Sequence, residues 1–256
     1  MQRRDFVKTA GLLAAVPALK GVAAPGQSAA KEKEIYEWRI YTLPAENAEL
    51  DAFYQGVLIP AYKRKKVTVG AFKPYLKTEK IQRFYLFVYP DLATYHKVKL
   101  DIWKDAQFRK DAQPFYDASA SKPVYSEFES FLCEAFDRVP QLIKPDKSRT
   151  LFEFRNYKSP NEEANQRKVK MFNIDEIAIF DQVGVNSVCY GEVLAGPRMP
   201  SLIYLTWYKD EPTRDEAWKK FGAHPDWLRI RSLPEYAHTA TDNKNLLLAP
   251  LPYSQL

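Results

Sequence analysis

The stretch "EIYEWRIYTL" (residues 34–43) alternates along its length in a way that decides how the chain folds. Side chains on a β-strand point in turn to opposite faces, so this stretch has an apolar face and a charged, aromatic face. The apolar face carries Tyr36, Trp38 and Ile40, and the other carries Glu37, Arg39 and Tyr41. The stretch "LFEFRNY" (151–157) repeats the Glu-x-Arg-x-Tyr pattern. We therefore predict strands that are covered by protein on both faces.

An internal repeat organises the chain from residue 31 onward. Besides the two Glu-x-Arg-x-Tyr strands, "YLFVYPD" (85–91) matches "YLTWYKD" (204–210) at nearly the same offset. In each half, the sequence pattern predicts the element order β-α-β-β-α-β, which is the ferredoxin-like arrangement. The expected fold class is α+β, with tandem ferredoxin-like repeats at 31–138 and 150–256 joined by a linker at 139–149.

The helices of a ferredoxin-like unit cover one face of its sheet, so the other face needs a second sheet. We expect the two sheets to meet, with the apolar rows on the helices and the Glu-x-Arg-x-Tyr rows enclosed between the sheets. Enclosed charges form either a structural ion-pair network or a polar cavity open to ligand. In such a cavity Arg would anchor an anionic or carbonyl-bearing ligand, and Glu would act as a base. The candidate ligand-binding residues are Glu37, Arg39, Tyr41, Tyr85, Glu153, Arg155, Tyr157 and Tyr204.

The first thirty residues have the features of an export signal. Arg3 and Arg4 form a basic start, an apolar stretch too short to span a bilayer follows, and small residues lead to Ala30. The sequence "RRDFVK" resembles the twin-arginine consensus. We expect residues 1–30 to direct export to the periplasm, and the mature protein to have no membrane span.

The charge of the remaining chain is nearly balanced. Residues 1–30 hold four of the 38 basic and one of the 32 acidic residues, which leaves a net charge of +3. So small an excess does not indicate nucleic acid as a partner. The two cysteines, Cys133 and Cys189, are either buried apolar residues or, if they lie close enough, a disulfide.

Motifs for metals and cofactors are missing from the sequence. The three histidines, His96, His224 and His238, have no second ligand at metal-binding spacing. GxSxG, phosphate-binding loops and dinucleotide fingerprints are absent as well. We expect neither a metal nor a cofactor.

The second half resembles the NIPSNAP family. The resemblance rests on Met171-Phe172-Asn173 followed by Glu176, on Gly191-Glu192, on "GPRMP" (196–200) and on the closing "LLLAPLPYSQL" (246–256). In the first half, "VLIPAYKRKKVTVGAF" (57–72) is similar to the same family. The resemblance implies a dimeric α/β-barrel fold, formed here as a pseudo-dimer by two halves of one chain. It implies no catalytic motif, although relatives of the fold include cofactor-independent monooxygenases.

Three functional hypotheses follow. The first is an exported protein of uncertain biochemical function that binds a small molecule in the polar cavity between its sheets. The second is a cofactor-independent monooxygenase-like enzyme. The third is a structural or interaction protein without a ligand. A homo-oligomer formed by self-association is one form of this hypothesis. An open cavity above about 300 Å³ with converging polar groups favours the first two, and a cavity filled by its own side chains favours the third.

Overall fold

The computed structural model describes residues 32–46, 48–118 and 122–256, so the expected export signal at 1–30 lies outside the described residues. The described part contains one closed antiparallel barrel with the strand order β1-β3-β2-β8-β5-β7-β6-β4. Together with its helices, the barrel makes a mixed α/β fold. The strands are β1 (Ile35–Leu43), β2 (Thr68–Pro74), β3 (Ile81–Tyr89), β4 (Glu127–Ala135), β5 (Leu151–Lys158), β6 (Asn186–Ala195), β7 (Ser201–Tyr208) and β8 (Asp242–Pro250).

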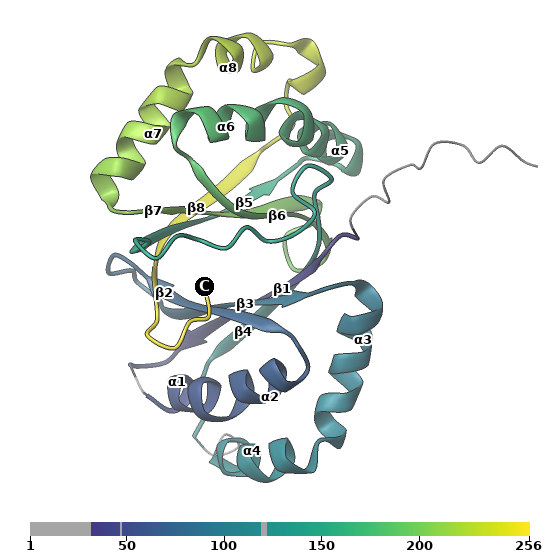
Figure 1. Cartoon of the computed structure of the whole chain (residues 1–256), viewed down its shortest axis with the longest axis vertical. Helices are drawn as coiled ribbons and strands as arrows, with labels where there is room; N and C mark the ends of the chain where they lie inside the picture. Colours follow the sequence, from purple (N-terminus) through teal and green to yellow (C-terminus); the bar gives the residue numbers. More distant parts are fainter. Residues whose placement is uncertain (1–31, 47, 119–121) are drawn as a thin grey trace, which may run out of the picture. The chain divides into compact units, whose positions relative to one another are not determined.

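Helices cover the barrel on two opposite sides (Figure 1). One side carries α1 (Glu49–Phe53), the π-helical η1 (Tyr54–Leu58), α2 (Ile59–Arg64), α3 (Leu92–Asp101), the short η2 (Ile102–Lys104) and α4 (Ala106–Ala118). The other side carries α5 (Glu162–Met171), the π-helical η3 (Phe172–Glu176), α6 (Ile177–Val183), α7 (Glu211–Ala223), α8 (Pro225–Ile230) and the short η4 (Pro234–Tyr236).

The strands of the two halves follow the same neighbour order. It is β4-β1-β3-β2 in the first half and β8-β5-β7-β6 in the second. The halves meet at two seams, β2 with β8 and β4 with β6, and the expected linker at 139–149 lies between β4 and β5. Because both seams are paired, residues 31–256 form one compact unit.

Side-chain caps start three of the helices directly after strands or turns. Asp91, Asn161 and Asp210 each accept a hydrogen bond from the backbone N–H three residues later, at 2.6, 2.9 and 2.8 Å. Such caps satisfy N–H groups that have no partner within the helix. The cap at Asp210 is followed by Pro212 in the first turn of α7, where the fixed φ of proline fits a helix start.

The barrel interior holds the apolar rows, which reverses the expected orientation of the strands. Trp38 of β1 meets Phe154 of β5 edge to face, with 4.9 Å between ring centroids. The interior cluster draws on every strand, and its large members include Tyr36, Trp38, Phe72, Phe84, Phe131, Phe152, Phe154 and Leu205. The Glu-x-Arg-x-Tyr rows instead face the helices. The reason is that a closed barrel this small is filled by side chains and leaves no water for charges, whereas the helices bring countercharges to the outer face.

Both cysteines are free and buried. Burial raises the pKa of the Cys133 thiol, and it raises the pKa of Cys189 further above its usual range. They therefore pack as small apolar residues in the interior cluster, which leaves the disulfide alternative unsupported. Among the helices of the described residues, none combines the length and the apolar character needed to span a membrane.

Close backbone approach at the seam between β4 and β6 requires a glycine. A Cβ at Gly191 would lie 2.7 Å from Cβ of Cys133 and 3.3 Å from the carbonyl oxygen of Glu134. Real Cβ atoms essentially never come as close as 2.7 Å to another heavy atom. Cys133 cannot move away easily, because the pairing of β4 with β6 holds it in place. Any side chain at Gly191 therefore pushes the two halves apart at this seam.

We expect Gly191→Ala to lower the free energy of unfolding by about 1–3 kcal/mol, because the added methyl group overpacks the seam. The matched control is Gly222→Ala on α7, where a Cβ meets nothing within 4 Å. This control should raise stability by about 0.5–1 kcal/mol, since Ala favours a helix interior over Gly. Urea denaturation of both variants measures the difference, and equal stabilities would contradict the packing of the seam.

Candidate functional site

Glu37 and Arg39 form a closed ion pair between the barrel and the helices of the first half. Arg39 donates from Nε and Nη2 to the two carboxylate oxygens of Glu37 at 3.0 and 2.9 Å. Lys99 of α3 adds a bond of 3.1 Å to Oε1, and the Tyr89 hydroxyl adds one of 2.8 Å to Oε2. Arg39 also donates to the Tyr62 hydroxyl of α2 at 3.0 Å. Helices α2 and α3 are thereby tied to the first strand.

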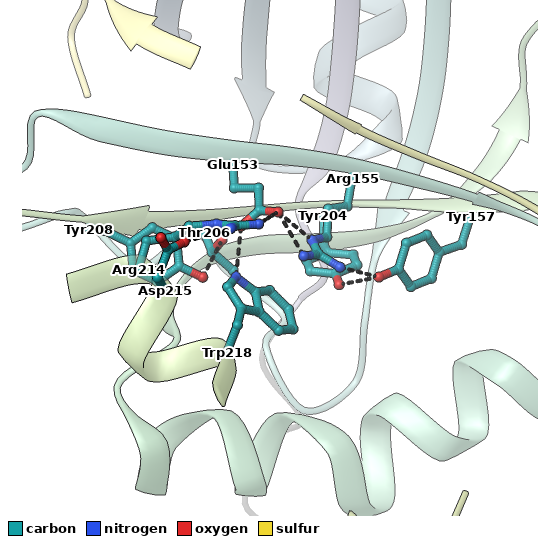
Figure 2. Close-up of polar contacts among 9 residues, drawn as sticks. All are labelled: Glu153, Arg155, Tyr157, Tyr204, Thr206, Tyr208, Arg214, Asp215 and Trp218. Atoms are coloured by element: carbon teal, nitrogen blue, oxygen red, sulfur yellow. Dashed lines mark hydrogen bonds and ion pairs between the residues drawn. The ribbon is translucent and has the colours of Figure 1, made fainter. Parts of the chain in front are cut away.

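Glu153 and Arg155 form the corresponding cluster in the second half, and Figure 2 shows its dashed contacts. Arg155 Nε donates to Glu153 Oε1 at 2.9 Å. Arg214 of α7 donates from Nε to Oε2 at 3.0 Å and from Nη2 to Oε1 at 2.8 Å, and Trp218 Nε1 adds a bond of 2.8 Å to Oε2. The Arg155 guanidinium carbon lies 3.7 Å from the ring centroid of Trp218, so the cation also stacks on the indole.

The predicted tyrosines belong to these same interfaces. Tyr157 accepts a hydrogen bond from Arg155 at 2.6 Å and from the Tyr204 hydroxyl at 2.9 Å. In the first half Tyr41 accepts from the Tyr54 hydroxyl at 3.0 Å. Tyr85 stacks on Tyr54 with 3.5 Å between ring centroids. Phenols in these positions pair with each other and pack under helices.

The eight predicted site residues therefore form two groups rather than one. Glu37, Arg39, Tyr41 and Tyr85 lie under the helices of the first half, and Glu153, Arg155, Tyr157 and Tyr204 lie under those of the second. The prediction that they enclose one cavity between the sheets is wrong, because the apolar interior of the barrel separates the groups. Within the described residues, no buried nitrogen or oxygen of these eight side chains is without a hydrogen-bond partner.

Both carboxylates are held in the ionised form. Burial alone would raise the pKa of Glu37, but the charges and hydrogen bonds of Arg39 and Lys99 lower it to about 2. For Glu153, burial is likewise outweighed by the Arg214 hydrogen bonds and the Arg155 charge, so its pKa lies below the usual value. A general base works best with a pKa near the working pH, and these paired carboxylates have no free lone pair aimed at a ligand. The clusters fit a structural role.

An open pocket of about 400 Å³ lies instead at one mouth of the barrel. Its apolar floor consists of Ile40, Phe84, Phe131 and Phe154, which are the last interior residues at this end. Polar side chains from β4, β5, β8 and the loop after β6 surround the floor. An apolar floor with a few convergent polar groups is the usual composition of a small-molecule site.

Asn156 and Arg198 are the polar residues that join this pocket to the barrel. Arg198 donates from Nε to Asn156 Oδ1 at 3.3 Å and from Nη1 to Asp242 Oδ2 at 2.6 Å. Its Nη2 reaches the Asp242 carbonyl oxygen at 2.8 Å. Asn156 is 1 % exposed, and its Nδ2 has no partner. Arg198 is thus fixed by three contacts, whereas the amide nitrogen of Asn156 is buried without a partner.

Sequence reasoning did not select these two residues, although signals for both were present. Arg198 lies in the Gly-Pro-Arg-Met-Pro run that carries the family resemblance. Asn156 takes the place in "LFEFRNY" that Ile40 takes in "IYEWRIY". A polar residue where the first half has an apolar one breaks the repeat, and Asn is uncommon inside a strand.

We expect Glu37→Gln to lower the free energy of unfolding at pH 7 by about 3 kcal/mol, because each pKa unit is worth about 1.4 kcal/mol. The folded-state pKa of Glu37 is depressed from 4.5 to about 2, so its contribution is complete above pH 4.5. That contribution is lost as the pH falls from 4.5 to 2. Urea denaturation across this range should give a flatter pH dependence for the variant.

The control for this change is Glu163→Gln, whose side chain is 72 % exposed on α5. Exposed ion pairs contribute little, so stability and its pH dependence should stay close to those of the wild type. An equal flattening in both variants would show that the buried cluster contributes no more than a surface pair.

Comparisons with known proteins agree with this architecture. Residues 152–255 match the NIPSNAP family, and no curated protein matches the chain. A candidate monooxygenase from Fusobacterium nucleatum is 10% identical, with a TM-score of 0.54 over 86% of this chain and 93% of that chain. A candidate monooxygenase from Lactobacillus acidophilus is also 10% identical, with a TM-score of 0.55 over 86% and 94%.

A NIPSNAP family protein of Agrobacterium tumefaciens is 20% identical, with a TM-score of 0.38 over 42% of this chain and 98% of that chain. At 10% identity the likeness to the two larger structures is one of fold alone, and it identifies the barrel as similar to theirs. The family match, which covers β5 to β8 and the closing segment, identifies the second half more closely. The chain thus carries a NIPSNAP domain over residues 152–255.

Proposed function

We propose that this protein is exported and binds a small molecule at the mouth of its barrel. The observation that carries the proposal is the pocket of about 400 Å³ with a phenylalanine floor and a polar rim. The paired Glu–Arg clusters leave no room for a ligand among their own groups, so they do not compete with the pocket as a site. A monooxygenase-like activity gains no support, since likeness of fold does not carry chemistry.

We further propose that the two halves are tandem ferredoxin-like repeats that form a pseudo-dimer within one chain. Support comes from the shared strand order and from the capping residues Asp91 and Asp210, which follow equivalent strands. The buried Glu–Arg pair on the first strand of each half supports it as well. On this view the pocket lies where the two repeats differ, because Ile40 and Asn156 occupy equivalent positions around it.

The ligand site is tested by filling the pocket. Leu246 lines it and packs against the interior cluster, so Leu246→Trp should place an indole in the space that a ligand would use. Native mass spectrometry of protein purified from the periplasm should show a bound mass on the wild type and none on this variant. The control Leu228→Trp changes a leucine that is 49 % exposed on α8, and it should keep the bound mass.

Both variants should melt within a few degrees of the wild type, since Leu246 is only partly buried and an indole keeps an apolar contact with the interior cluster, while Leu228 is exposed. A wild-type protein that carries no ligand after gentle purification would contradict the proposed function. Retention of the bound mass by Leu246→Trp would place the ligand elsewhere on the protein.

Export through the twin-arginine route is the remaining part of the proposal. The support is the "RRDFVK" sequence with Arg3 and Arg4 ahead of a short apolar stretch. The double change Arg3→Lys and Arg4→Lys keeps the charge but removes the arginine pair. In a bacterium with a working twin-arginine pathway, cell fractionation should find the wild type in the periplasm and the variant in the cytoplasm. Equal periplasmic amounts would contradict this route.

A further inference from the structure

Two oppositely charged residues line the pocket at the mouth of the barrel. Glu129 belongs to β4 and Lys244 to β8, and both residues are exposed. Glu129 lies two residues before Phe131, and Lys244 lies two residues before Leu246, so each shares a strand face with that apolar neighbour. Phe131 belongs to the interior cluster and Leu246 packs against it. The two charges therefore continue interior rows of the barrel at the point where those rows reach the open pocket.

The two charged residues lie on opposite walls of the mouth. In the closed strand order, three strands separate β4 from β8 in either direction. Glu129 pairs with Ile40 of β1, and Lys244 pairs with Asn156 of β5. Since Ile40 and Asn156 hold equivalent places in the two Glu-x-Arg-x-Tyr strands, the two charged residues hold equivalent places as well. A barrel of eight strands about 4.8 Å apart and tilted by about 40° is roughly 16 Å wide between opposite backbones.

Glu129 has no direct ion-pair partner within the described residues. Lys80 attracts it at longer range. The ammonium group of Lys80, however, is hydrogen-bonded to Glu127 at 2.8 Å. The carboxylate of Glu129 is therefore exposed at the pocket wall, where it can pair with a cationic group that enters from solvent.

Lys244 likewise forms no direct ion pair in the part of the chain that the structure describes. Asp242 attracts it at longer range. The carboxylate of Asp242, however, accepts from Arg198 Nη1 at 2.6 Å. That ion pair also neutralises Arg198, which is the third charged residue that lines the pocket. Among the described residues of the pocket, Glu129 and Lys244 thus hold the two charges that lack a direct partner.

Unpaired charges of opposite sign on facing walls give the pocket an electrostatic direction. Their field is complementary to a molecule that carries a cation at one end and an anion at the other. A molecule with a single charge meets one attractive and one repulsive residue, and an uncharged molecule gains from the apolar floor alone. Because both residues are exposed, the charges of a ligand can pair with them without complete loss of water.

We infer that the pocket binds a zwitterionic molecule with an apolar middle, whose cationic group pairs with Glu129 and whose anionic group pairs with Lys244. The apolar middle lies on the floor formed by Phe84, Phe131 and Phe154. This inference rests on the proposed function, since it names the ligand class of the same pocket. It also gives a role to the difference between the two halves, because charges of one sign at both positions would not orient such a molecule.

Four probes share one apolar body and differ in charge. 4-(Aminomethyl)benzoate carries both charges, 4-methylbenzoate only the anion, 4-methylbenzylamine only the cation, and 4-methylbenzyl alcohol neither. Dissociation constants are measured by protein-observed NMR titration of the full mature chain at low ionic strength. We expect the zwitterion to bind about 1.5- to 5-fold more tightly than either singly charged probe, which is the effect of one exposed ion pair. This advantage should shrink as salt is added, because salt screens exposed charges.

Exchange of the two charges tests the pairing directly. Glu129→Lys makes both walls basic, so the zwitterion should lose its advantage and 4-methylbenzoate should bind more tightly than it does to the wild type. Lys244→Glu makes both walls acidic and should favour 4-methylbenzylamine instead. The double variant again has one charge of each sign, so the zwitterion should regain its advantage in the reversed orientation. Residues that only keep the mouth solvated would show no such rescue.

Matched controls change the net charge by the same amounts away from the pocket. Glu163→Lys on α5 and Lys97→Glu on α3 alter side chains that are 72 % and 77 % exposed. Both controls should bind the four probes in the same order of affinity as the wild type. Since every substitution in this series alters an exposed residue, all variants should fold, and urea denaturation of each one checks this.

The outcomes distinguish the inference from the proposed function. Suppose that Leu246→Trp abolishes binding, but that the four probes bind the wild type equally or the double variant does not restore the zwitterion. The pocket then stands and the zwitterion inference is overturned. If none of the probes binds, or if Leu246→Trp binds them as the wild type does, the inference is also overturned. In that case the bound mass on the purified wild type decides the proposed function by itself.

Discussion

The structure depends on one constraint, which is that the interior of the closed barrel must be dry. Trp38 and Phe154 meet there across the two halves, and the apolar rows of every strand fill the space around them. Burial of this apolar surface is the main driving force that joins the halves. Once those rows face inward, the period of two places Glu37 and Glu153 on the outer face, under the helices. The ion pairs and hydrogen bonds between the helices and the barrel in each half follow from that placement.

Buried carboxylates under a helix need partners, and the helices supply them. Lys99 on α3 and Arg214 on α7 each reach the glutamate of the first strand in their half. Such pairs add little net stability relative to apolar packing, but loss of one partner is costly, so they fix which helix lies on which strand. The clusters are therefore better understood as contacts that fix the position of each helix on the sheet than as reactive groups.

Much of the fold could be predicted from the sequence, and the error in the site has a definite physical cause. Hydrophobic periodicity predicted strands at 34–43 and 151–157 and the order of elements in each half, and both agree with the structure. Periodicity also separated the two faces of β1 and β5. It could not say which face turns inward, because both are covered and neither shows a solvent-exposed row. The countercharges that decide the matter, Lys99 and Arg214, lie far away in the sequence and carry no pattern of their own.

The pocket at the barrel mouth was beyond sequence reasoning for a different reason. Its members come from five strands and a loop, so their proximity depends on closure of the barrel at both seams. The sequence did contain one signal: the second half has Asn156 at the strand position where the first half has Ile40. Natural sequences agree with their folds at most positions, and departures concentrate where function requires them. In the Glu–Arg clusters every buried polar atom is paired, so the chain satisfies its own groups. At Asn156 it does not: Nδ2 is buried without a partner in a residue whose oxygen holds Arg198 at the wall of the pocket, so the repeat departs from its apolar pattern where the pocket begins.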